Sequence, residues 1–198
     1  RRRAPHVRSF RDPGQCLGTI DFFPQEGKYH YAGHRKCGIC WDPEETIRHG
    51  SLCPVCGKPV TMGVLNRVNE LADRIDGSEK PCRLPFYSLI PLKEILSEIH
   101  GTGTGTKQIK VAYQNLIQKA GNEFSVLLHE PLDTLAGFAD PVIVEAVRRM
   151  REGKVIIKPG YDGEFGQIRV FEKGEVELLG QNGSLFGEVG NRRQAAGG

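Results

Sequence analysis

Two pairs of cysteines with identical internal spacing constrain the fold of this 198-residue chain more than any other feature. Cys37 and Cys40 form the first pair, and Cys53 and Cys56 form the second, with twelve residues between the pairs. Four thiolates at such a spacing can surround one ion as a tetrahedron, which is the arrangement of structural zinc sites. The sequence therefore predicts a zinc ribbon with these four cysteines as ligands. A four-cysteine site leaves no open coordination position, so the predicted zinc is structural.

The alternative interpretation of these cysteines is a pair of disulfides. Disulfides belong to oxidising compartments, and the other two cysteines, Cys16 and Cys82, fall outside the paired pattern. The chain also starts without the apolar stretch of a signal peptide, and it has no membrane-spanning run of about eighteen apolar residues. We therefore expect zinc, a cytoplasmic location and no membrane partner. With four cysteines present, we expect His30 and His34 to lie beside the site or on the surface.

The first 36 residues form a basic segment. They contain eight Lys and Arg residues against three Asp and Glu residues, whereas the whole chain has a formal net charge of +3. Clustered positive charge favours an anionic partner such as nucleic acid, and a solvated tail is the alternative interpretation.

Apolar residues recur at helical spacing over residues 63–75, directly after the second cysteine pair. This pattern predicts an amphipathic helix with Val64, Val68 and Leu71 on its inner face. A linker over residues 76–81 follows, because its composition is polar and ends in proline.

Three further helices are predicted in the middle of the chain. One covers residues 92–100 after Pro91, the next ends near residue 119 before Gly121, and the last starts at Asp140-Pro141 and runs to about residue 152. The pattern over residues 123–135 does not separate helix from strand.

Alternating apolar residues predict three short strands near the C-terminus, over residues 155–157, 167–171 and 176–179. With tight turns between them, these strands would form an antiparallel meander. In the first turn, Tyr161 and Phe165 are expected to pack in the core, and stacking on a nucleobase is the alternative.

Together these patterns predict an α+β chain, in which a small four-cysteine zinc ribbon precedes a mostly helical region and a C-terminal antiparallel β-meander. The expected parts are a basic N-terminal segment (1–36), a zinc ribbon plus helix (37–76), a helical region (82–153), the meander (154–180) and a disordered tail (181–198).

A run of alternating Gly and Thr, residues 101–106, lies between two of the predicted helices. Successive glycines expose backbone N–H groups, and the start of the next helix adds a partial positive charge. The order of residues differs from a P-loop, in which Lys is followed by Ser or Thr. The run instead resembles the turn of a helix-hairpin-helix, and a flexible connector is the equally weighted alternative. The predicted contacts to DNA phosphates are Gly101, Gly103, Gly105, Lys107 and Lys110.

Catalytic patterns are scarce in this sequence. The six histidines are scattered, with neither His-x-His nor His-Glu-x-x-His, and no Gly-x-Ser-x-Gly occurs. A hydrolytic metal centre needs several His and carboxylate ligands around open positions. We therefore predict no catalytic residues in this chain, and a complete small metallohydrolase ranks last among its possible functions.

Several segments, taken in order, are similar to one family. From about residue 16 to 180 the chain resembles the later portion of PHP-family phosphoesterases that carry a zinc ribbon, the group that includes endonuclease Q. The matching segments are Glu26-Gly27-Lys28-Tyr29-His30-Tyr31, the ribbon from Cys37 to Cys56, Gly63-Val64-Leu65-Asn66-Arg67-Val68, Leu71-Ala72-Asp73-Arg74, Leu89-Ile90-Pro91-Leu92 and Gly160-Tyr161-Asp162-Gly163.

This resemblance implies a role in DNA repair. Endonuclease Q cuts a DNA strand on the 5′ side of deaminated bases and abasic sites, and its catalytic metals are held by a PHP domain that precedes the ribbon. We expect this chain to be the zinc-binding, DNA-engaging C-terminal portion of such an enzyme, with the PHP domain as its partner in cis. The alternative is a structural or protein-interaction module without direct DNA contact. A weak salt dependence of DNA binding would favour that alternative.

Overall fold

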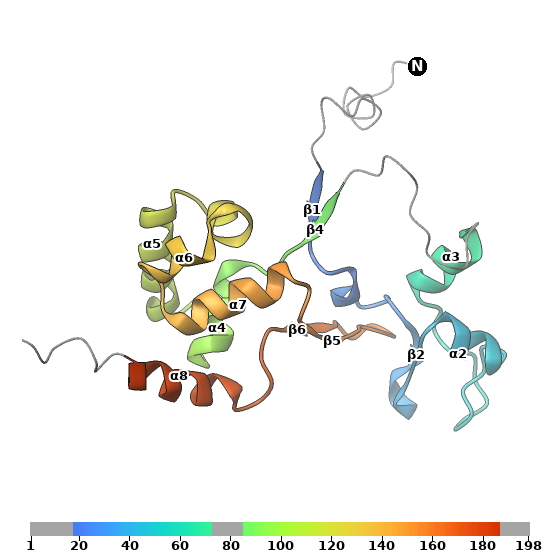
Figure 1. Cartoon of the computed structure of the whole chain (residues 1–198). Helices are drawn as coiled ribbons and strands as arrows, with labels where there is room; N and C mark the ends of the chain where they lie inside the picture. The colour runs from blue at the N-terminus through green and yellow to red at the C-terminus, as the bar shows by residue number, and fades with distance from the viewer. Residues whose placement is uncertain (1–17, 73–84, 187–198) are drawn as a thin grey trace, which may run out of the picture. The chain divides into compact units, whose positions relative to one another are not determined.

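The structure is a computed structural model that describes residues 18–72 and 85–186. The chain divides into two units, and Figure 1 labels the elements of both. Unit 1 comprises Arg1–Leu89 with Ile157–Ile168, and unit 2 comprises Ile90–Ile156 with Arg169–Gly198. Short strand pairs and helices confirm the predicted α+β class. Cys16, Cys82 and residues 1–17 of the basic segment lie outside the described residues.

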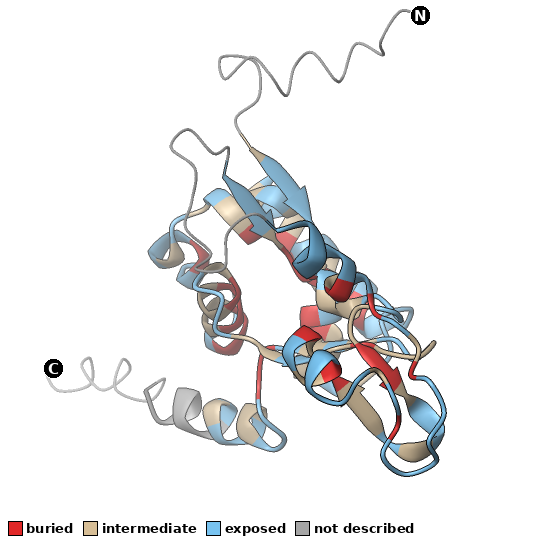
Figure 2. Ribbon diagram, turned by 90° about the vertical axis from the view of Figure 1, so that its right-hand side faces the viewer, coloured by how far each residue is buried: buried red, intermediate tan, exposed pale blue. Residues whose placement is uncertain are grey.

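Unit 1 begins with two strands that are distant in sequence. Strand β1 (Thr19–Asp21) pairs in parallel with β4 (Phe86–Ser88), so that Ile20 lies opposite Tyr87. Both strands are exposed along most of their length (Figure 2). The chain then turns through the short 3-10 helix η1 (Pro24–Glu26).

A hairpin forms the centre of unit 1. Strand β2 (Ala32–His34) pairs antiparallel with β3 (Ile39–Trp41), and the 3-10 turn η2 (Arg35–Cys37) joins them. Gly38 closes this turn with a φ of 69°, a left-handed conformation that glycine adopts without steric cost.

Helix α2 (Pro43–Arg48) follows the hairpin and is capped by Asp42. The Asp42 carboxylate accepts a hydrogen bond from the N–H of Glu45 at 2.8 Å, and Pro43 occupies the first helical position. The small core of this unit is formed by the buried residues Ala32, Trp41, Cys53 and Val60.

Helix α3 (Val64–Leu71) confirms the predicted helix, but the prediction of its inner face was wrong. Val64, Val68 and Leu71 are 62%, 55% and 66% exposed, whereas Asn66 is buried. The orientation of α3 is set by backbone hydrogen bonds at its start. The N–H of Val64 donates to the carbonyl of Tyr29 at 2.7 Å, and this contact at the first helical residue sets which side of α3 faces the hairpin.

Unit 2 contains the predicted helices α4 (Leu92–His100), α5 (Lys107–Ala120) and α7 (Pro141–Arg151), which lie together in Figure 1. Thr106 caps α5, and Asp140 caps α7 by accepting a hydrogen bond from Val142 N–H at 2.8 Å. No helix among residues 18–72 and 85–186 has the length and apolar content to cross a membrane. The buried apolar side chains of this unit include Leu92, Ile95, Leu96, Ile109, Leu127, Leu135, Val147 and Phe171.

Residues 123–135, for which the sequence pattern did not separate helix from strand, are mostly helical. A π-helical turn, η3 (Ser125–His129), precedes the short helix α6 (Leu132–Ala136). Arg151 of α7 donates from Nε to the carbonyl of Leu127 at 3.0 Å and from Nη2 to that of Val126 at 2.9 Å. The Arg151 guanidinium thus donates to two carbonyls of the π-helical turn.

Two of the three predicted C-terminal strands are confirmed, β5 (Ile156–Lys158) and β6 (Gln167–Arg169), which form a two-stranded sheet. The third was wrong, because residues 176–179 belong to helix α8 (Glu175–Phe186). Glu175 stabilises the start of this helix by accepting hydrogen bonds from Arg149 Nη2 at 2.6 Å and from the N–H of Glu172 at 2.9 Å. The helix also includes residues 181–186 of the predicted disordered tail, and residues 187–198 lie outside the described chain.

Candidate metal centre and phosphate-binding turn

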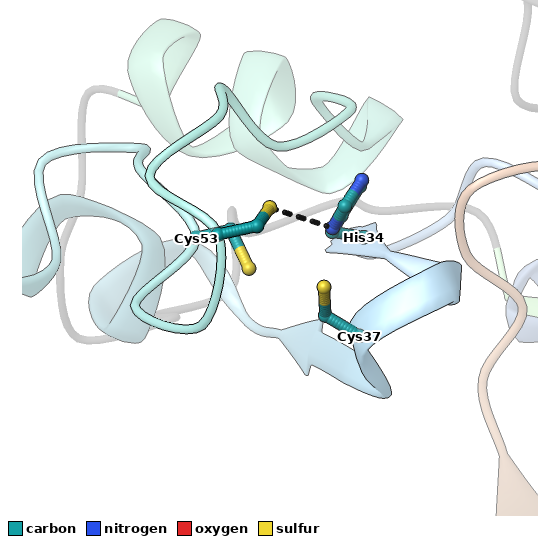
Figure 3. Close-up of side chains that lie close together, drawn as sticks. His34, Cys37 and Cys53 are labelled. Atoms are coloured by element: carbon teal, nitrogen blue, oxygen red, sulfur yellow. Dashed lines mark hydrogen bonds between the residues drawn. The ribbon is translucent and has the colours of Figure 1, made fainter.

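Four metal-ligating side chains converge in unit 1: His34, Cys37, Cys53 and Cys56. One ligand atom from each lies within 4.8 Å of all the others. His34 Nδ1 is 3.6 Å from the sulfur of Cys56. Figure 3 shows His34 and Cys37 facing the loop that carries Cys53. In the described part of the chain, this is the one cluster of three or more His, Cys, Asp or Glu residues close enough to share an ion.

Two local turns with the same spacing bring these ligands together. His34 and Cys37 are three positions apart across η2, and Cys53 and Cys56 are three positions apart in the following loop. The second turn is closed by hydrogen bonds from Cys53 N–H to the carbonyl of Lys58 and from Gly57 N–H to the carbonyl of Cys53, both at 2.8 Å. The metal site thus follows from two turns that each present two ligands.

The structure brings together three of the four predicted cysteines, and His34 takes the place expected for Cys40. Neighbouring residues of a strand point to opposite faces. In the β2–β3 hairpin, His34 lies opposite Ile39, whose side chain packs against the core that includes Cys53. Cys40 lies opposite Gly33 and belongs to the other face, where its charge adds to the desolvation that raises the pKa of Tyr31 and of Tyr161.

The sequence contained a signal for this arrangement. His34 precedes Cys37 by the same interval that separates Cys53 from Cys56, so the His34–Cys37 pair fits a zinc knuckle as well as the Cys37–Cys40 pair does. Spacing alone does not choose between them. The choice depends on which side chain the hairpin turns toward the core.

The protonation of the thiols reflects how closely they are grouped. Desolvation, followed by hydrogen bonds with Cys56 and Cys53, raises the pKa of Cys37 to about 11. Desolvation would also raise the pKa of Cys53, but hydrogen bonds from the backbone N–H groups of Cys56 and Val55 and from His34 lower it to about 6. A cluster with one thiol that ionises easily and another that resists ionisation is suited to a cation, which stabilises every thiolate in its coordination sphere.

The donor set fits a tetrahedral ion. Metal–ligand bonds of roughly 2.0–2.3 Å place the donors of such a site about 3.3–3.8 Å apart. The His34–Cys56 separation of 3.6 Å falls in this range, and all four donors lie within 4.8 Å of one another. One imidazole and three thiolates form a common ligand set of structural zinc, and all four positions are then filled by protein. The geometry therefore supports a metal-binding site without an open catalytic position.

The loop between β5 and β6 is tied to this centre by Asp162. Its carboxylate accepts hydrogen bonds from the backbone N–H of Arg35 at 2.7 Å and from the hydroxyl of Thr61 at 2.6 Å. The Thr61 bond, and then the Arg35 bond, lower the pKa of Asp162 below its usual value. Arg35 lies directly between two ligands in sequence, so Asp162 fixes the turn that presents His34 and Cys37.

The predicted phosphate-binding residues lie in unit 2, in the turn between α4 and α5. Gly101, Gly103, Gly105, Lys107 and Lys110 are all exposed. Thr106 accepts a hydrogen bond from the N–H of Ile109 and so defines the start of α5. Within the described residues, the N–H groups of Gly103, Thr104 and Gly105 have no hydrogen-bond partner. The metal ligands and these residues therefore belong to separate units.

Fold and site together define a class of protein: a small α+β unit, with a His/Cys cluster that could hold a metal ion, in one chain with a helical unit. Residues 91–154 match the family described as the MJ0043 C-terminal domain. Protein MJ0043 of Methanocaldococcus jannaschii is 38% identical over 154 residues, which cover 78% of this chain and 19% of that protein. YqxK of Bacillus subtilis is 26% identical over 163 residues, which cover 80% of this chain and 37% of YqxK.

Two solved structures are similar in fold and sequence. The lesion-specific endonuclease PfuEndoQ of Pyrococcus furiosus matches with a TM-score of 0.66 and 32% identity, over 82% of this chain and 40% of PfuEndoQ. Endonuclease Q in complex with a 27-mer duplex that carries an abasic lesion at the active site also matches with a TM-score of 0.66, with 28% identity over 86% of this chain and 42% of that one. The chain thus spans less than half the length of these relatives. The resemblance to the C-terminal portion of endonuclease Q, expected from the sequence, is confirmed.

Proposed function

We propose that this chain is the zinc-binding, DNA-engaging C-terminal portion of a DNA-repair endonuclease that acts at deaminated bases. The observation that carries this proposal is the likeness to PfuEndoQ, with 32% identity over 82% of the chain. Further support comes from the related structure that holds a duplex with an abasic lesion. Cleavage would depend on catalytic metals held by a PHP domain in cis.

In this proposal the metal is zinc, and its role is structural. His34, Cys37, Cys53 and Cys56 would hold it, and the bound ion would stabilise the hairpin and the loop after α2. The ion supplies no nucleophile and no open position. Its contribution to function is to keep the surface of unit 1 in one conformation.

The turn between α4 and α5 would bind DNA through its phosphates. Three consecutive N–H groups, those of Gly103, Thr104 and Gly105, are available to donate hydrogen bonds to an anion beside the N-terminus of a 14-residue helix. Lys107 and Lys110 add positive charge next to them. Contacts of this kind position a protein on the duplex without reading its sequence.

A structural or protein-interaction module without DNA contact is the second candidate. It is favoured by the apolar face of α3, on which Val64, Val68 and Leu71 are exposed at helical spacing. Exposed apolar positions that lie on one side of a helix are typical of a surface that another protein covers.

The test is the binding of the chain to fluorescent duplex DNA, with and without uracil, measured by anisotropy across a salt series. We expect affinity to fall steeply as salt rises. In the double variant Lys107→Ala/Lys110→Ala, the magnitude of the salt slope should fall by about two. Lys173→Ala, which removes an exposed lysine outside the turn, serves as the matched control and should change neither affinity nor slope.

The outcomes separate the two candidates. Absence of binding at low salt would contradict the DNA-engaging function and favour the interaction module. If the double variant bound DNA with the same affinity and salt slope as wild type, the role of the turn would be contradicted but the DNA-engaging function would stand. A preference for uracil-containing DNA would place part of the lesion-recognition surface in this chain.

A further inference from the structure

An exposed phenylalanine stands on the loop between β5 and β6. Phe165 is 66% exposed, so the expectation that it packs in the core was wrong, whereas Tyr161 of the same loop is partly buried. The ammonium group of Lys28 lies 4.9 Å from the centre of the Phe165 ring. This is the geometry of a cation–π contact, in which a positive charge rests against an aromatic face.

The loop that carries Phe165 is held firmly by the backbone of unit 1. The N–H groups of Gly160, Gly163 and Gly166 donate to the carbonyls of Gln25, Lys28 and Glu26 at 2.8, 2.9 and 3.0 Å. Backbone atoms crowd Gly160, where an added Cβ would lie 2.5 Å from the carbonyl oxygen of Gly27. The exposure of Phe165 is therefore a property of a well-fixed loop.

The charges around this ring favour an anionic partner. Lys28, Arg35, Lys36 and Lys158 are exposed on the segments that form or contact the loop. The acids of the same segments are Glu26, Asp162 and Glu164, one fewer than the cations, and the Asp162 carboxylate accepts hydrogen bonds from Arg35 N–H and the Thr61 hydroxyl. A ligand that combines an aromatic face with a negative charge matches this surface.

We propose that Phe165 and Lys28 form a platform for an unpaired nucleotide, whose base stacks on the exposed ring while its phosphate lies near the Lys28 ammonium. Stacking on an aromatic side chain tolerates any base, because every base has a π-face. This proposal rests on the DNA-engaging function proposed above and assigns to unit 1 a contact separate from the glycine-rich turn of unit 2. A base extruded from the duplex would then stack on the Phe165 ring in place of its neighbouring bases.

The experiment uses a single-stranded oligonucleotide that contains one 2-aminopurine, a base whose fluorescence falls when it stacks. We expect the wild-type chain to quench this fluorescence and Phe165→Ala to lose the quenching together with about tenfold in affinity. Phe165→Tyr should retain both, because the ring remains. Phe22→Ala removes another exposed phenylalanine of unit 1, 59% exposed, and should behave as wild type.

Two results would overturn the inference. If Phe165→Ala quenched and bound as wild type does, while binding remained salt-dependent, the platform would be wrong and the DNA-engaging function would stand. If the wild-type chain bound neither the oligonucleotide nor duplex DNA, both would fail, and the exposed ring would belong to a protein contact. The zinc content and unfolding temperature of each variant confirm that only the surface has changed.

Discussion

The carboxylate of Asp162 accepts a hydrogen bond from the backbone N–H of Arg35 at 2.7 Å, although the two residues are 127 positions apart in sequence. Arg35 lies between the metal-site residues His34 and Cys37, and the same carboxylate also binds the hydroxyl of Thr61 at 2.6 Å. One side chain therefore joins the loop between β5 and β6 to both segments around the metal centre. Loss of this contact should therefore weaken the binding of metal.

Asp162→Ala should speed the release of metal and lower the stability of unit 1. The substitution removes two hydrogen bonds to a charged acceptor and leaves the partly buried Thr61 hydroxyl without its partner, at a cost of about 1–3 kcal/mol. The rate of metal transfer to a chromogenic chelator measures the first effect, and thermal unfolding measures the second. Asp162→Asn is the matched control, because Asn tolerates the positive φ of 46° at this position and keeps one oxygen acceptor. A chelation rate unchanged in Asp162→Ala would contradict the proposed link.

Gly160→Ala should destabilise unit 1 more strongly than a surface substitution would. The added methyl group would lie 2.5 Å from both the carbonyl oxygen of Gly27 and the backbone nitrogen of Gly166, so backbone must move. We expect a loss of about 2 kcal/mol in the free energy of unfolding, typical of overpacking. Gly103→Ala is the control, because no atom lies within 4 Å of its added Cβ. Equal stability of the two variants in urea unfolding would show that the loop is not packed as described.

Glu145→Gln should destabilise unit 2 in a pH-dependent way. Glu145 binds Arg148 and Arg149 at 2.6 and 2.7 Å, and the Arg148 hydrogen bond is the largest of the effects that lower its pKa from 4.5 to about 2. Because the folded-state pKa is depressed, the stabilisation is complete above pH 4.5 and is lost as the pH falls toward 2.

We expect the substitution to cost about 1–2 kcal/mol at pH 7, a value reduced for the partial exposure of these side chains. Urea unfolding followed by the helical circular dichroism signal, at pH 7, 4 and 3, measures this cost. The difference between variant and wild type should shrink at each step below pH 4.5. A cost that stays constant to pH 3 would show that Glu145 stabilises unit 2 by packing and not by charge.

The sequence was sufficient for most of unit 2, because its helices are delimited by residues with strong local preferences. Helix α4 covers residues 92–100 as predicted, with Gly101 in a left-handed conformation at its end. Asp140 and Pro141 define the start of α7 by capping and by a fixed φ. Such signals act within a few residues and need no knowledge of the tertiary structure.

Features that depend on contacts between residues far apart in the sequence could not be predicted from local patterns. Residues 176–179 alternate as a strand would, but Arg149 of α7 binds Glu175 and supports a helix there. The apolar stripe of α3 predicted an inner face, but backbone bonds to residues 29 and 30 turn that stripe outward. In both cases the decisive partner lies more than 25 residues away.

The metal ligands illustrate the same limit at the candidate site. The structure places Cys37, Cys53 and Cys56 in one cluster, and the face of the β2–β3 hairpin separates His34 from Cys40. His34 and Cys40 flank Cys37 at equal intervals. The choice between them as ligands therefore required the register of the hairpin, which spacing in the sequence does not give.

X-ray absorption spectroscopy of the zinc-loaded chain, combined with zinc analysis of two variants, tests the central claim most directly. The account predicts one zinc per chain, bound by three sulfurs and one nitrogen. Zinc should be lost in His34→Ala and retained in Cys40→Ser, because Cys40 lies outside the cluster. A shell of four sulfurs, with zinc retained in His34→Ala and lost in Cys40→Ser, would contradict it.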